Sequence, residues 1–407
     1  MSESQLQTLT LKDLQDAVAG TAAAFRLTLK LEAVSPKVFP PTYEGGKYAT
    51  EERIINGQKL PCVLLDSVPS QANRMELALQ EALDSGQIKL PLVTVNFAAL
   101  NNPGVPRITS LQAPHRIADA ILRDSILGEG KEPPKFRDSG IGQDLNRLSA
   151  GYATPLLKHA PHCLVFGMWD STGPRGGLGV KFARAVVSEI IGVNSVSGVK
   201  TSSRIDPLNI RVNSGTLYKA KEGWTLDEKE AVQEKGRPVK LGKDGKPSEA
   251  NHGNVTPTIS DGGFTIDYAE QTTVLSLPAL RRLRFPVKPG EKSSPESDTA
   301  ARTYLASLGL LGATLAVEAG HDLRSRCILR AANRIEWNLL GKPGDADTPF
   351  TLDKEAALKL YQEALVGVQE AKLPIHLEEI LLTPCDDLLT LVNRSMELAA
   401  TETGEGN

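Results

Sequence analysis

The stretch CLVFGMWDSTGPRGGLGVKFARAVVSEIIG, residues 163–192, is the part of the chain that decides the fold class. Its first eight residues are mostly apolar and predict a buried strand over 163–170. The next nine hold four glycines and a proline, which predicts a loop over 171–179. Over 180–192 apolar residues recur at helical spacing and predict an amphipathic helix. The residues expected to face inward are Phe182, Val186, Val187 and Ile190, and those expected to face outward are Lys181 and Arg184.

Further helices and strands are predicted on both sides of this unit. The expected helices cover 11–19, 70–82, 114–125, 299–319, 353–371 and the residues after Pro384, with Ser70 able to cap the second. The expected strands cover 25–34, 62–68, 92–97 and 375–383. The elements do not alternate as regular parallel units, and no internal repeat is visible. The sequence therefore predicts an α+β fold.

Between residues 204 and 298 the composition changes to short strand-like pieces separated by Gly, Pro, Lys and Ser. Such a segment has too few apolar residues to build a core, so we expect an inserted arm that is partly mobile. The expected organisation is then a first part of the core over 1–203, the arm over 204–298, and completion of the core with an acidic C-terminal region over 299–407.

The composition is typical of a soluble, cytoplasmic protein. Of 407 residues, 40% are hydrophobic and 23% charged. The apolar run at 305–317 is shorter than the roughly 18 residues that a membrane span needs, and the N-terminus has no signal-peptide pattern. Four widely spaced cysteines are expected to be reduced thiols. We expect no membrane association.

Charge is unevenly distributed along the chain. The net charge is -3, yet residues 341–407 carry five Lys or Arg against 13 Asp or Glu, so residues 1–340 have a net charge of +5. Cations concentrate in KGRPVKLGKDGK (235–246) and in RRLRFPVK (281–288), where they surround Phe285. Cations interleaved with an aromatic residue suit a phosphate chain with stacked bases. Solvated turns and a charge-guarded edge strand are the alternative.

The glycine-rich loop is the strongest candidate site. Its glycines let the backbone approach a ligand, and a helix N-terminus after it would attract an anion. The spacing matches neither a Walker loop nor a dinucleotide fingerprint, which leaves a phosphodiester backbone or a glycine turn that only packs. The residues expected to form this anion site are Gly173, Arg175, Gly176, Gly177, Gly179 and Lys181.

Three other groups could carry chemistry. Candidate metal ligands are His159, His162 and Cys163. Pro161 lies between them and makes it difficult for the three side chains to converge on one ion, so we predict no metal and no cofactor. The set Arg116, Asp119, Arg123 and Asp124 is either an acid/base constellation or, more commonly, a helical ion-pair ladder. Asp170 could ligate a divalent ion in a nuclease, although it has no nearby carboxylate partner in the sequence.

Five blocks in order resemble one family. They are SVPSQANRMELAL (67–79), LQAPHRIADAILRDS (111–125), the stretch 164–192, SRIDPLNI (203–210) and DLRSRCIL (322–329). Together they resemble the backbone subunit of the type I-U, or I-G, CRISPR effector complex, a member of the repeat-associated (RAMP) superfamily. The first 60 residues and the acidic C-terminal region carry no motif of this kind. The aromatic signature of ordinary RNA-recognition modules is also not found.

The resemblance implies an RNA-recognition-motif-like (ferredoxin-like) core with helical insertions and a thumb-like arm. It implies a non-catalytic protein that binds CRISPR guide RNA, stacks with copies of itself, supports recognition of the target DNA protospacer, and meets a large subunit and a fused guide-processing and cap subunit. An alternative is a metal-dependent ribonuclease that uses Asp170, and a third is an anion-binding metabolic enzyme. Besides the loop residues, the expected RNA-binding residues are Arg116, Arg123, Arg204, Arg281, Arg282, Arg284 and Arg324.

Overall fold

The structure is a computed structural model that describes residues 6–100, 107–172 and 180–406, with side chains up to residue 399. It divides into two compact units. Unit 1 combines Met1–Val196 with Phe264–Cys385, and unit 2 combines Ser197–Gly263 with Asp386–Asn407.

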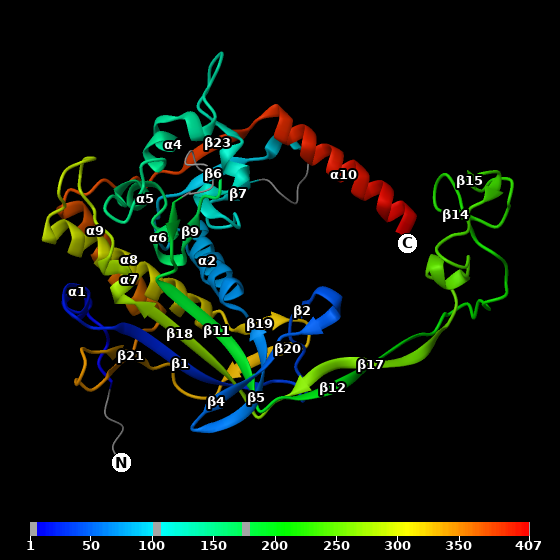
Figure 1. The fold of residues 1–407 in the computed structure, drawn as a ribbon, viewed down its shortest axis with the longest axis horizontal. Helices are drawn as coiled ribbons and strands as arrows, with labels where there is room; N and C mark the ends of the chain where they lie inside the picture. The colour runs from blue at the N-terminus through cyan, green and yellow to red at the C-terminus, as the bar shows by residue number, and fades with distance from the viewer. Residues whose placement is uncertain (1–5, 101–106, 173–179, 407) are drawn as a thin grey trace. The chain divides into compact units, whose positions relative to one another are not determined.

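Unit 1 is built on a nine-stranded sheet in the order β19-β20-β1-β18-β11-β5-β4, with β21 and β22 attached beside β1 (Figure 1). All its neighbouring strands run antiparallel. The strands are β1 (Ala24–Ala33), β4 (Thr50–Ile55), β5 (Gln58–Asp66), β11 (Val186–Val193), β18 (Tyr268–Ser276), β19 (His321–Arg324), β20 (Cys327–Ala331), β21 (Trp337–Leu340) and β22 (Thr348–Phe350). The sheet curls, because Arg324 of β19 reaches Leu65 and Asp66 of β5, four strands beyond its own neighbour β20.

The central strand β1 shows why these sequences form a half-covered sheet. Phe25, Leu27, Leu29 and Leu31 are fully buried, and the residues between them are polar. This period of two places every apolar side chain on one face. The predicted strand over 25–34 is therefore confirmed.

Helices cover the apolar face of the sheet. They are α1 (Leu11–Ala19), α2 (Val68–Asp84), α7 (Leu277–Arg281), α8 (Pro295–Glu318) and α9 (Lys354–Glu370), and α8 packs against α1, α2 and α9 (Figure 1). Gly309 lets α8 approach the sheet, because a Cβ there would lie 2.8 Å from Val186 Cγ2. α8 is long and apolar enough to cross a membrane, but 83% of its apolar window is buried inside the protein, as in a core helix.

A second, four-stranded sheet completes unit 1. Its order is β7-β6-β23-β8, with bounds Arg107–Thr109, Val93–Asn96, Ile380–Pro384 and Ser125–Leu127, and only β6 and β23 are parallel. Short helices connect it to the core, namely α3 (Ala120–Arg123), α4 (Gly140–Leu145), α5 (Thr154–His159) and α6 (His162–Phe166). The β6 and β23 strands and the helices α1, α2, α8 and α9 follow the sequence prediction within a few residues.

Residues 163–192 contradict the prediction in both halves. The first half is the buried helix α6 followed by the short strand β9 (Met168–Trp169), and the second is strand β10 (Lys181–Phe182) followed by β11. Val187 is exposed, contrary to expectation. The reason is that β-branched residues dominate 186–193, and that β11 pairs with β18 on one side and β5 on the other. No helix begins after the loop, so the predicted helix N-terminus for an anion is not there.

Two smaller predictions also need correction. The cap of α2 is Ser67, whose side chain accepts a hydrogen bond from the Ser70 backbone N–H. The single helix expected over 114–125 is broken into a 3₁₀ turn (Arg116–Ala118) and the one-turn helix α3. Asp119 separates them, because its side chain accepts from the backbone of Ile121 and caps the second piece.

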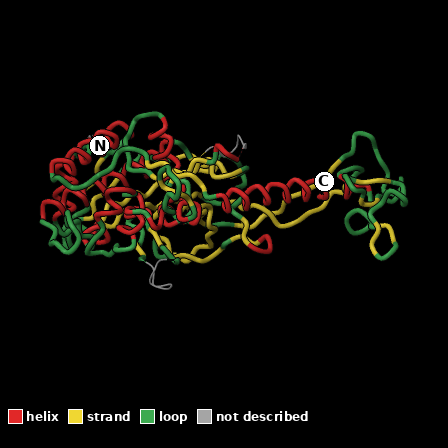
Figure 2. The backbone as a smooth tube through the Cα atoms, turned by 90° about the horizontal axis from the view of Figure 1, so that it is seen from above, coloured by secondary structure: helices red, strands yellow, loops and turns green. Residues whose placement is uncertain are grey.

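Unit 2 contains a long hairpin of β12 (Val196–Arg204) and β17 (Val255–Thr265). Between them the chain consists mostly of loops with the short strands β13 to β16, which are Tyr218–Lys219, Trp224–Thr225, Gln233–Glu234 and Arg237–Pro238 (Figure 2). Leu217, Leu241 and Ala250 form its small core. The unit also includes α10 (Asp386–Gly406).

The boundaries of unit 2 differ from those of the predicted arm. Residues 264–298, which were expected in the arm, contain β18, α7 and the first turn of α8 in unit 1. β18 alternates buried and half-buried residues and pairs with β1 and β11. Its Gln and Thr residues hid a central strand from a reading based on hydrophobicity. The α+β fold class is confirmed.

Candidate nucleic-acid interface

The residues on either side of the glycine-rich loop form a small hairpin of β9 and β10. Lys181 pairs with Trp169, and Phe182 pairs with Met168. Gly167 starts the hairpin at φ +87, where a Cβ would lie 3.0 Å from the Arg184 side chain and 3.2 Å from the Phe182 carbonyl. Only glycine fits this close approach without strain.

Beside this hairpin lies a pocket of about 300 Å³. Its lining contains three cations, a histidine and several apolar or aromatic side chains, and no Asp or Glu. The lining includes His115, Arg116, Phe166, Trp169, Lys181 and Arg184. An enclosed excess of positive charge next to aromatic surface suits a ligand that is both anionic and planar.

Trp169 and Lys181 form the exposed wall of this pocket. The indole of Trp169 is 53% exposed, and Lys181 Nζ lies 5.9 Å from the centre of its ring. A large exposed aromatic side chain supported by a cation is a platform on which a nucleic-acid base can stack. Neither residue has a carboxylate partner in the part of the chain that the structure describes.

Arg116 forms the floor of the pocket. It is buried, and its Nε and Nη2 donate to the two carboxylate oxygens of Glu76 at 2.6 and 2.7 Å, while Nη1 donates to the Gly167 carbonyl. This bidentate pair ties the guanidinium to the interior of the protein, so the structure gives no support to the prediction that Arg116 contacts RNA. The carboxylate that captures it lies 40 residues away and could not be foreseen from spacing.

Arg184 shares this one carboxylate with Arg116 at longer range. Burial lowers the pKa of Arg184, and the neighbouring Arg116 cation lowers it further, while Glu76 raises it. Burial raises the pKa of Glu76 to about 7, opposed by Arg116. Two guanidiniums and one carboxylate leave a local excess of cation, which an incoming phosphate would neutralise.

The base of the loop is clamped on its other side. Arg137 Nη2 lies 3.0 Å from both carboxylate oxygens of Asp170, and its Nη1 donates to the Thr172 carbonyl. Asp170 also accepts from the Thr172 backbone N–H. Arg123 pairs with Asp124 and reaches the Thr172 hydroxyl at 3.5 Å. Asp170 therefore holds the loop through hydrogen bonds and an ion pair.

The proposed histidine ligands are buried as neutral side chains. His162 Nε2 lies 3.2 Å from the Ser110 carbonyl, and burial lowers its pKa to about 3. Burial also lowers the pKa of His159 to about 4 and raises that of Cys163 to about 12. Within the described residues no group of three or more His, Cys, Asp or Glu could hold a metal ion.

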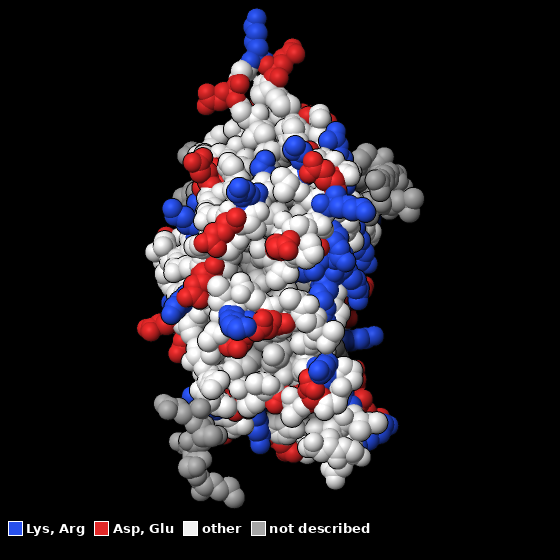
Figure 3. Space-filling model, turned by 90° about the vertical axis from the view of Figure 1, so that its left-hand side faces the viewer, with Lys and Arg blue, Asp and Glu red and all other residues white. Residues whose placement is uncertain are grey.

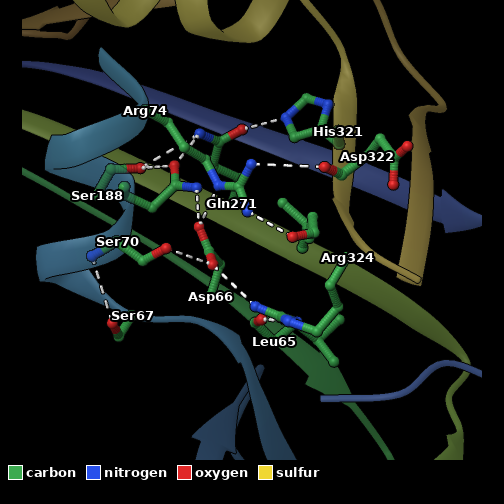
Figure 4. Close-up of polar contacts among 12 residues, drawn as sticks. Leu65, Asp66, Ser67, Ser70, Arg74, Ser188, Gln271, His321, Asp322 and Arg324 are labelled. Carbon is green, nitrogen blue, oxygen red and sulfur yellow. Dashed lines mark hydrogen bonds and ion pairs between the residues drawn. The ribbon is translucent and has the colours of Figure 1, made fainter. Parts of the chain in front are cut away.

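Arg324 belongs to a buried polar network around Asp66, which is fully buried at the end of β5 (Figure 4). Arg324 Nη2 and Arg74 Nε contact the two oxygens of this carboxylate at 3.1 and 2.9 Å. Ser70 and Gln71 also donate to it. Arg324 further donates to the Leu65 carbonyl at 2.7 Å. Its donors thus join β19 to β5 and help to close the curled sheet, so the structure gives no support to the prediction that Arg324 binds RNA.

The cations at 281–288 lie elsewhere on unit 1. Arg281 donates to the carbonyls of Ala17 and Ala22, whereas Arg282 and Arg284 are exposed. Phe285 is fully buried and cannot stack on a base. The segment is the end of α7 and a loop, not an edge strand. Figure 3 shows Lys and Arg side chains gathered near one edge of the view, while charges of both signs alternate over the rest.

The remaining predicted residues are split between unit 2 and the undescribed loop. Arg204 is half-buried at the end of β12 in unit 2. Gly173, Arg175, Gly176, Gly177 and Gly179 lie outside the described residues. Within unit 1, the structure thus brings Arg116, Arg123 and Lys181 to the hairpin, and places the 281–284 group and Arg324 elsewhere.

Sequence reasoning missed Trp169, Arg184, Arg137 and His115 at this site. Trp169 precedes the glycine-rich loop and Lys181 follows it at nearly the same distance along the chain. The sequence therefore contained a signal for this site, namely an aromatic residue and a cation on the two sides of a glycine-rich turn. Arg137 carried no such signal, because its partner Asp170 is 33 residues away.

Comparison with known proteins gives a family and two structural neighbours. Residues 26–196 match the family described as CRISPR-associated protein GSU0053. No curated protein matches the chain. One similar structure is titled "CRISPR RNA-guided surveillance complex, pre-nicking" (10% identity, 92% of this chain and 100% of that chain, TM-score 0.32). Another is Csc2 from Thermofilum pendens (12% identity, 97% of this chain and 87% of that chain, TM-score 0.27).

Both TM-scores are below 0.5, so the assignment rests on the family match. That match spans most of β1 and all of β5, α2 and the β9–β10 hairpin. Its residues also include three of the five sequence blocks that resembled a CRISPR family. Residues 26–196 are therefore similar to the CRISPR-associated protein family GSU0053, while the rest of the chain lies outside this match.

Proposed function

We propose that this chain is the guide-RNA-binding backbone subunit of a type I-U/I-G CRISPR effector complex and is not itself a catalyst. In this proposal several copies line the guide RNA, support its pairing with a target DNA protospacer, and contact the large subunit and the fused guide-processing and cap subunit. The complex works in the cytoplasm. The observation that carries the proposal is the acid-free pocket beside the glycine-rich loop, with Trp169 and Lys181 at its exposed wall.

The chemistry of this pocket supports RNA backbone binding without sequence preference. Lys181 and Arg184 supply charge for phosphates, and Trp169 offers a face to any base. Backbone contacts position a strand without reading its sequence, which is what a subunit that accepts any spacer requires. Contacts of Arg137 with Asp170 and Thr172 hold the residues that precede the loop.

The strand order supports an RNA-recognition-motif-like core. In chain order the elements β1, α2, β11, β18, α8 and β20 follow the pattern βαββαβ. In the sheet, the four strands lie in the order β20-β1-β18-β11, that is fourth, first, third and second. This is the order of a ferredoxin-like sheet. The hairpin of β4 and β5 is an addition between β1 and α2.

The alternative of a ribonuclease using Asp170 finds less support. Both carboxylate oxygens of Asp170 face Arg137 Nη2 at 3.0 Å, and the Thr172 backbone also donates to one of them. A metal ion at this carboxylate would have to displace a guanidinium. We propose that Asp170 positions the loop. Target RNA incubated with the protein and Mg²⁺ is then expected to stay intact, and cleavage that disappears in Asp170→Ala would establish the alternative.

The proposal is tested by titrating labelled guide RNA against Lys181→Ala and Arg184→Ala at several salt concentrations. Each variant should weaken binding by a similar factor for two unrelated spacer sequences. Each should also lower the slope of log affinity against log salt by about 0.7, the value for one phosphate of a single strand. Thermal midpoints should stay within about 1 °C of the wild type.

Lys12→Ala is the matched control, because it removes one exposed lysine that already pairs with Asp16. It should leave RNA affinity unchanged. If the pocket variants behave like Lys12→Ala, the pocket is not on the RNA path. Nucleic acid that co-purifies with the protein gives a second readout: RNA of discrete guide length supports the proposal, and protein free of RNA argues for an anion-binding enzyme instead.

A further inference from the structure

We propose that the turn between β19 and β20 carries a second contact for single-stranded RNA, in which Arg326 is the residue that touches the strand. The inference rests on the proposed function, which supplies the RNA. It concerns a different part of unit 1, on the hairpin that the Asp66 network holds in place (Figure 4).

Arg326 is an exposed cation on an aromatic platform. Its guanidinium carbon lies 3.9 Å from the centre of the Phe39 ring. Within the described residues it has no ion pair with a carboxylate. The Phe39 backbone N–H donates to the Arg326 carbonyl at 3.1 Å, so the arginine's own backbone places the ring under its side chain. One guanidinium face is covered by this ring, and the other face and the N–H edge are left for a ligand.

The backbone at Arg326 is unusual for an arginine. Arg324 pairs with Cys327 across a two-residue turn, and Arg326 has φ +63. Glycine and asparagine adopt this left-handed conformation most readily, and other residues there carry strain. Such strain gathers at functional sites, and here it places a charged side chain at the tip of the hairpin.

The β19–β20 hairpin is tied to the rest of unit 1 by Arg74 of α2 and by its own Arg324. Arg74 donates to the carbonyls of Asp322 and Leu323, and Arg324 donates to Leu65 and Asp66. In Figure 4 the side chains of Arg74 and Arg324 both point toward Asp66. These contacts fix the strand that carries Arg326 and leave Arg326 as the cation that remains available at this turn.

A guanidinium in this state suits single-stranded RNA. Its planar face can stack on an unpaired base, and its N–H edge can donate two hydrogen bonds to a phosphate. Stacking on Phe39 restricts the side chain before binding, so less conformational freedom is lost when the strand arrives. Arg330, on β20 of the same hairpin, already pairs with Glu32 at 2.6 Å and lacks this availability.

The experiment measures guide-RNA affinity and thermal midpoint for Arg326→Ala, Arg326→Lys and Arg330→Ala in the full chain, with Lys181→Ala alongside. Arg326→Ala should weaken RNA binding about 5- to 20-fold, as expected for loss of one stacked, charged contact. Arg326→Lys keeps the charge without the plane and should recover only part of the loss. Arg330→Ala removes the same charge and should bind like the wild type.

The outcomes separate this inference from the proposed function. If Lys181→Ala weakens RNA binding while Arg326→Ala matches Arg330→Ala, only the second contact is overturned, and Arg326 merely covers Phe39. If the wild-type protein fails to bind RNA, the proposed function itself fails. A loss in Arg326→Ala that combines multiplicatively with the loss in Lys181→Ala would support two separate contacts on one strand.

Discussion

Arg116 and Lys181 line the same pocket, yet they belong to two different regions of the molecule. Arg116 lies in the interior beside α2, where Glu76 meets it with both carboxylate oxygens. Lys181 lies on the β9–β10 hairpin, where it meets the ring of an exposed tryptophan and no acid among the described residues. In the interior the charge of Arg116 is neutralised by an acid, whereas on the hairpin the charge of Lys181 is not neutralised by any acid among the described residues.

The same contrast recurs at the Asp66 network and the β19–β20 turn. Arg74 and Arg324 share one buried carboxylate, whereas Arg326 lies on Phe39. A buried acid draws a cation into the fold, because removing either partner leaves an uncompensated charge. An aromatic platform leaves the cation's charge unneutralised and open to a ligand. The difference separates residues that hold the fold from residues that we propose to bind RNA.

The largest expected effect is on the interior pair. Arg116→Ala should reduce the free energy of unfolding by about 3–5 kcal/mol, because it strands Glu76 in a buried site. Urea unfolding monitored by circular dichroism measures this. The double variant Glu76→Leu with Arg116→Met should recover much of the loss. If Arg116→Ala instead lowered RNA affinity and left stability unchanged, Arg116 would be a residue that contacts RNA and not one that holds the fold.

The next effect concerns the Asp66 network. Asp66→Asn keeps the shape of the side chain but removes the charge that holds Arg74 and Arg324, and should cost about 2–4 kcal/mol of stability. Asp124→Asn is the matched control, because Asp124 pairs with Arg123 at the surface, and it should cost less than about 1 kcal/mol. Equal losses in the two variants would show that the network does not close the sheet.

On the hairpin, Trp169→Ala should weaken guide-RNA binding by about 1–3 kcal/mol with no change in thermal midpoint, because the indole packs little of the core. Trp224→Ala, which removes a 40% exposed tryptophan in unit 2, serves as the comparison. A drop in stability without a loss of affinity would place Trp169 with the interior residues.

The smallest effect is a pH dependence of the interior. His162 has a pKa lowered from 6.5 to about 3 by burial, so below pH 6.5 the unfolded chain binds a proton that the folded chain does not. The free energy of unfolding therefore decreases as pH falls from 6.5 toward 3. The decrease due to His162 amounts to about 1.4 kcal/mol at pH 5.5.

Urea unfolding of the wild type and His162→Gln at pH 7.5 and 5.5 measures this term. The variant should lose less stability on acidification, and His159, whose pKa is lowered to about 4, should contribute to the loss that remains. An identical loss in the two proteins would mean that His162 already carries a proton in the fold.

Sequence patterns predicted the elements whose side chains repeat with one clear period. β1, α1, α2, α8 and α9 were recovered, because their apolar residues follow a period of two or of about 3.6. The pattern failed at 163–192, where a five-residue apolar run is as compatible with a helix as with a strand. It also failed at β18, whose polar run of Glu270, Gln271, Thr272 and Thr273 was assigned to an arm.

For the candidate site, the sequence identified the glycine-rich loop and Lys181 but not what surrounds them. It also assigned Arg116, Arg281 and Arg324 to RNA, although each donates to groups of the protein itself. The sequence shows which side chains are cationic. Whether such a side chain is available to a ligand depends on which acid or carbonyl lies within about 3 Å of it after folding.

By itself, then, the sequence determined the α+β class, the outer helices and the resemblance to a CRISPR-associated family, because these depend on local periodicity and on ordered motifs. Only the tertiary structure decided that β11 is a strand and that Arg116 and Arg324 are internal. The physical reason is that both depend on partners distant in sequence: β11 pairs with β18 and β5, and the two arginines meet carboxylates 40 and 258 residues away.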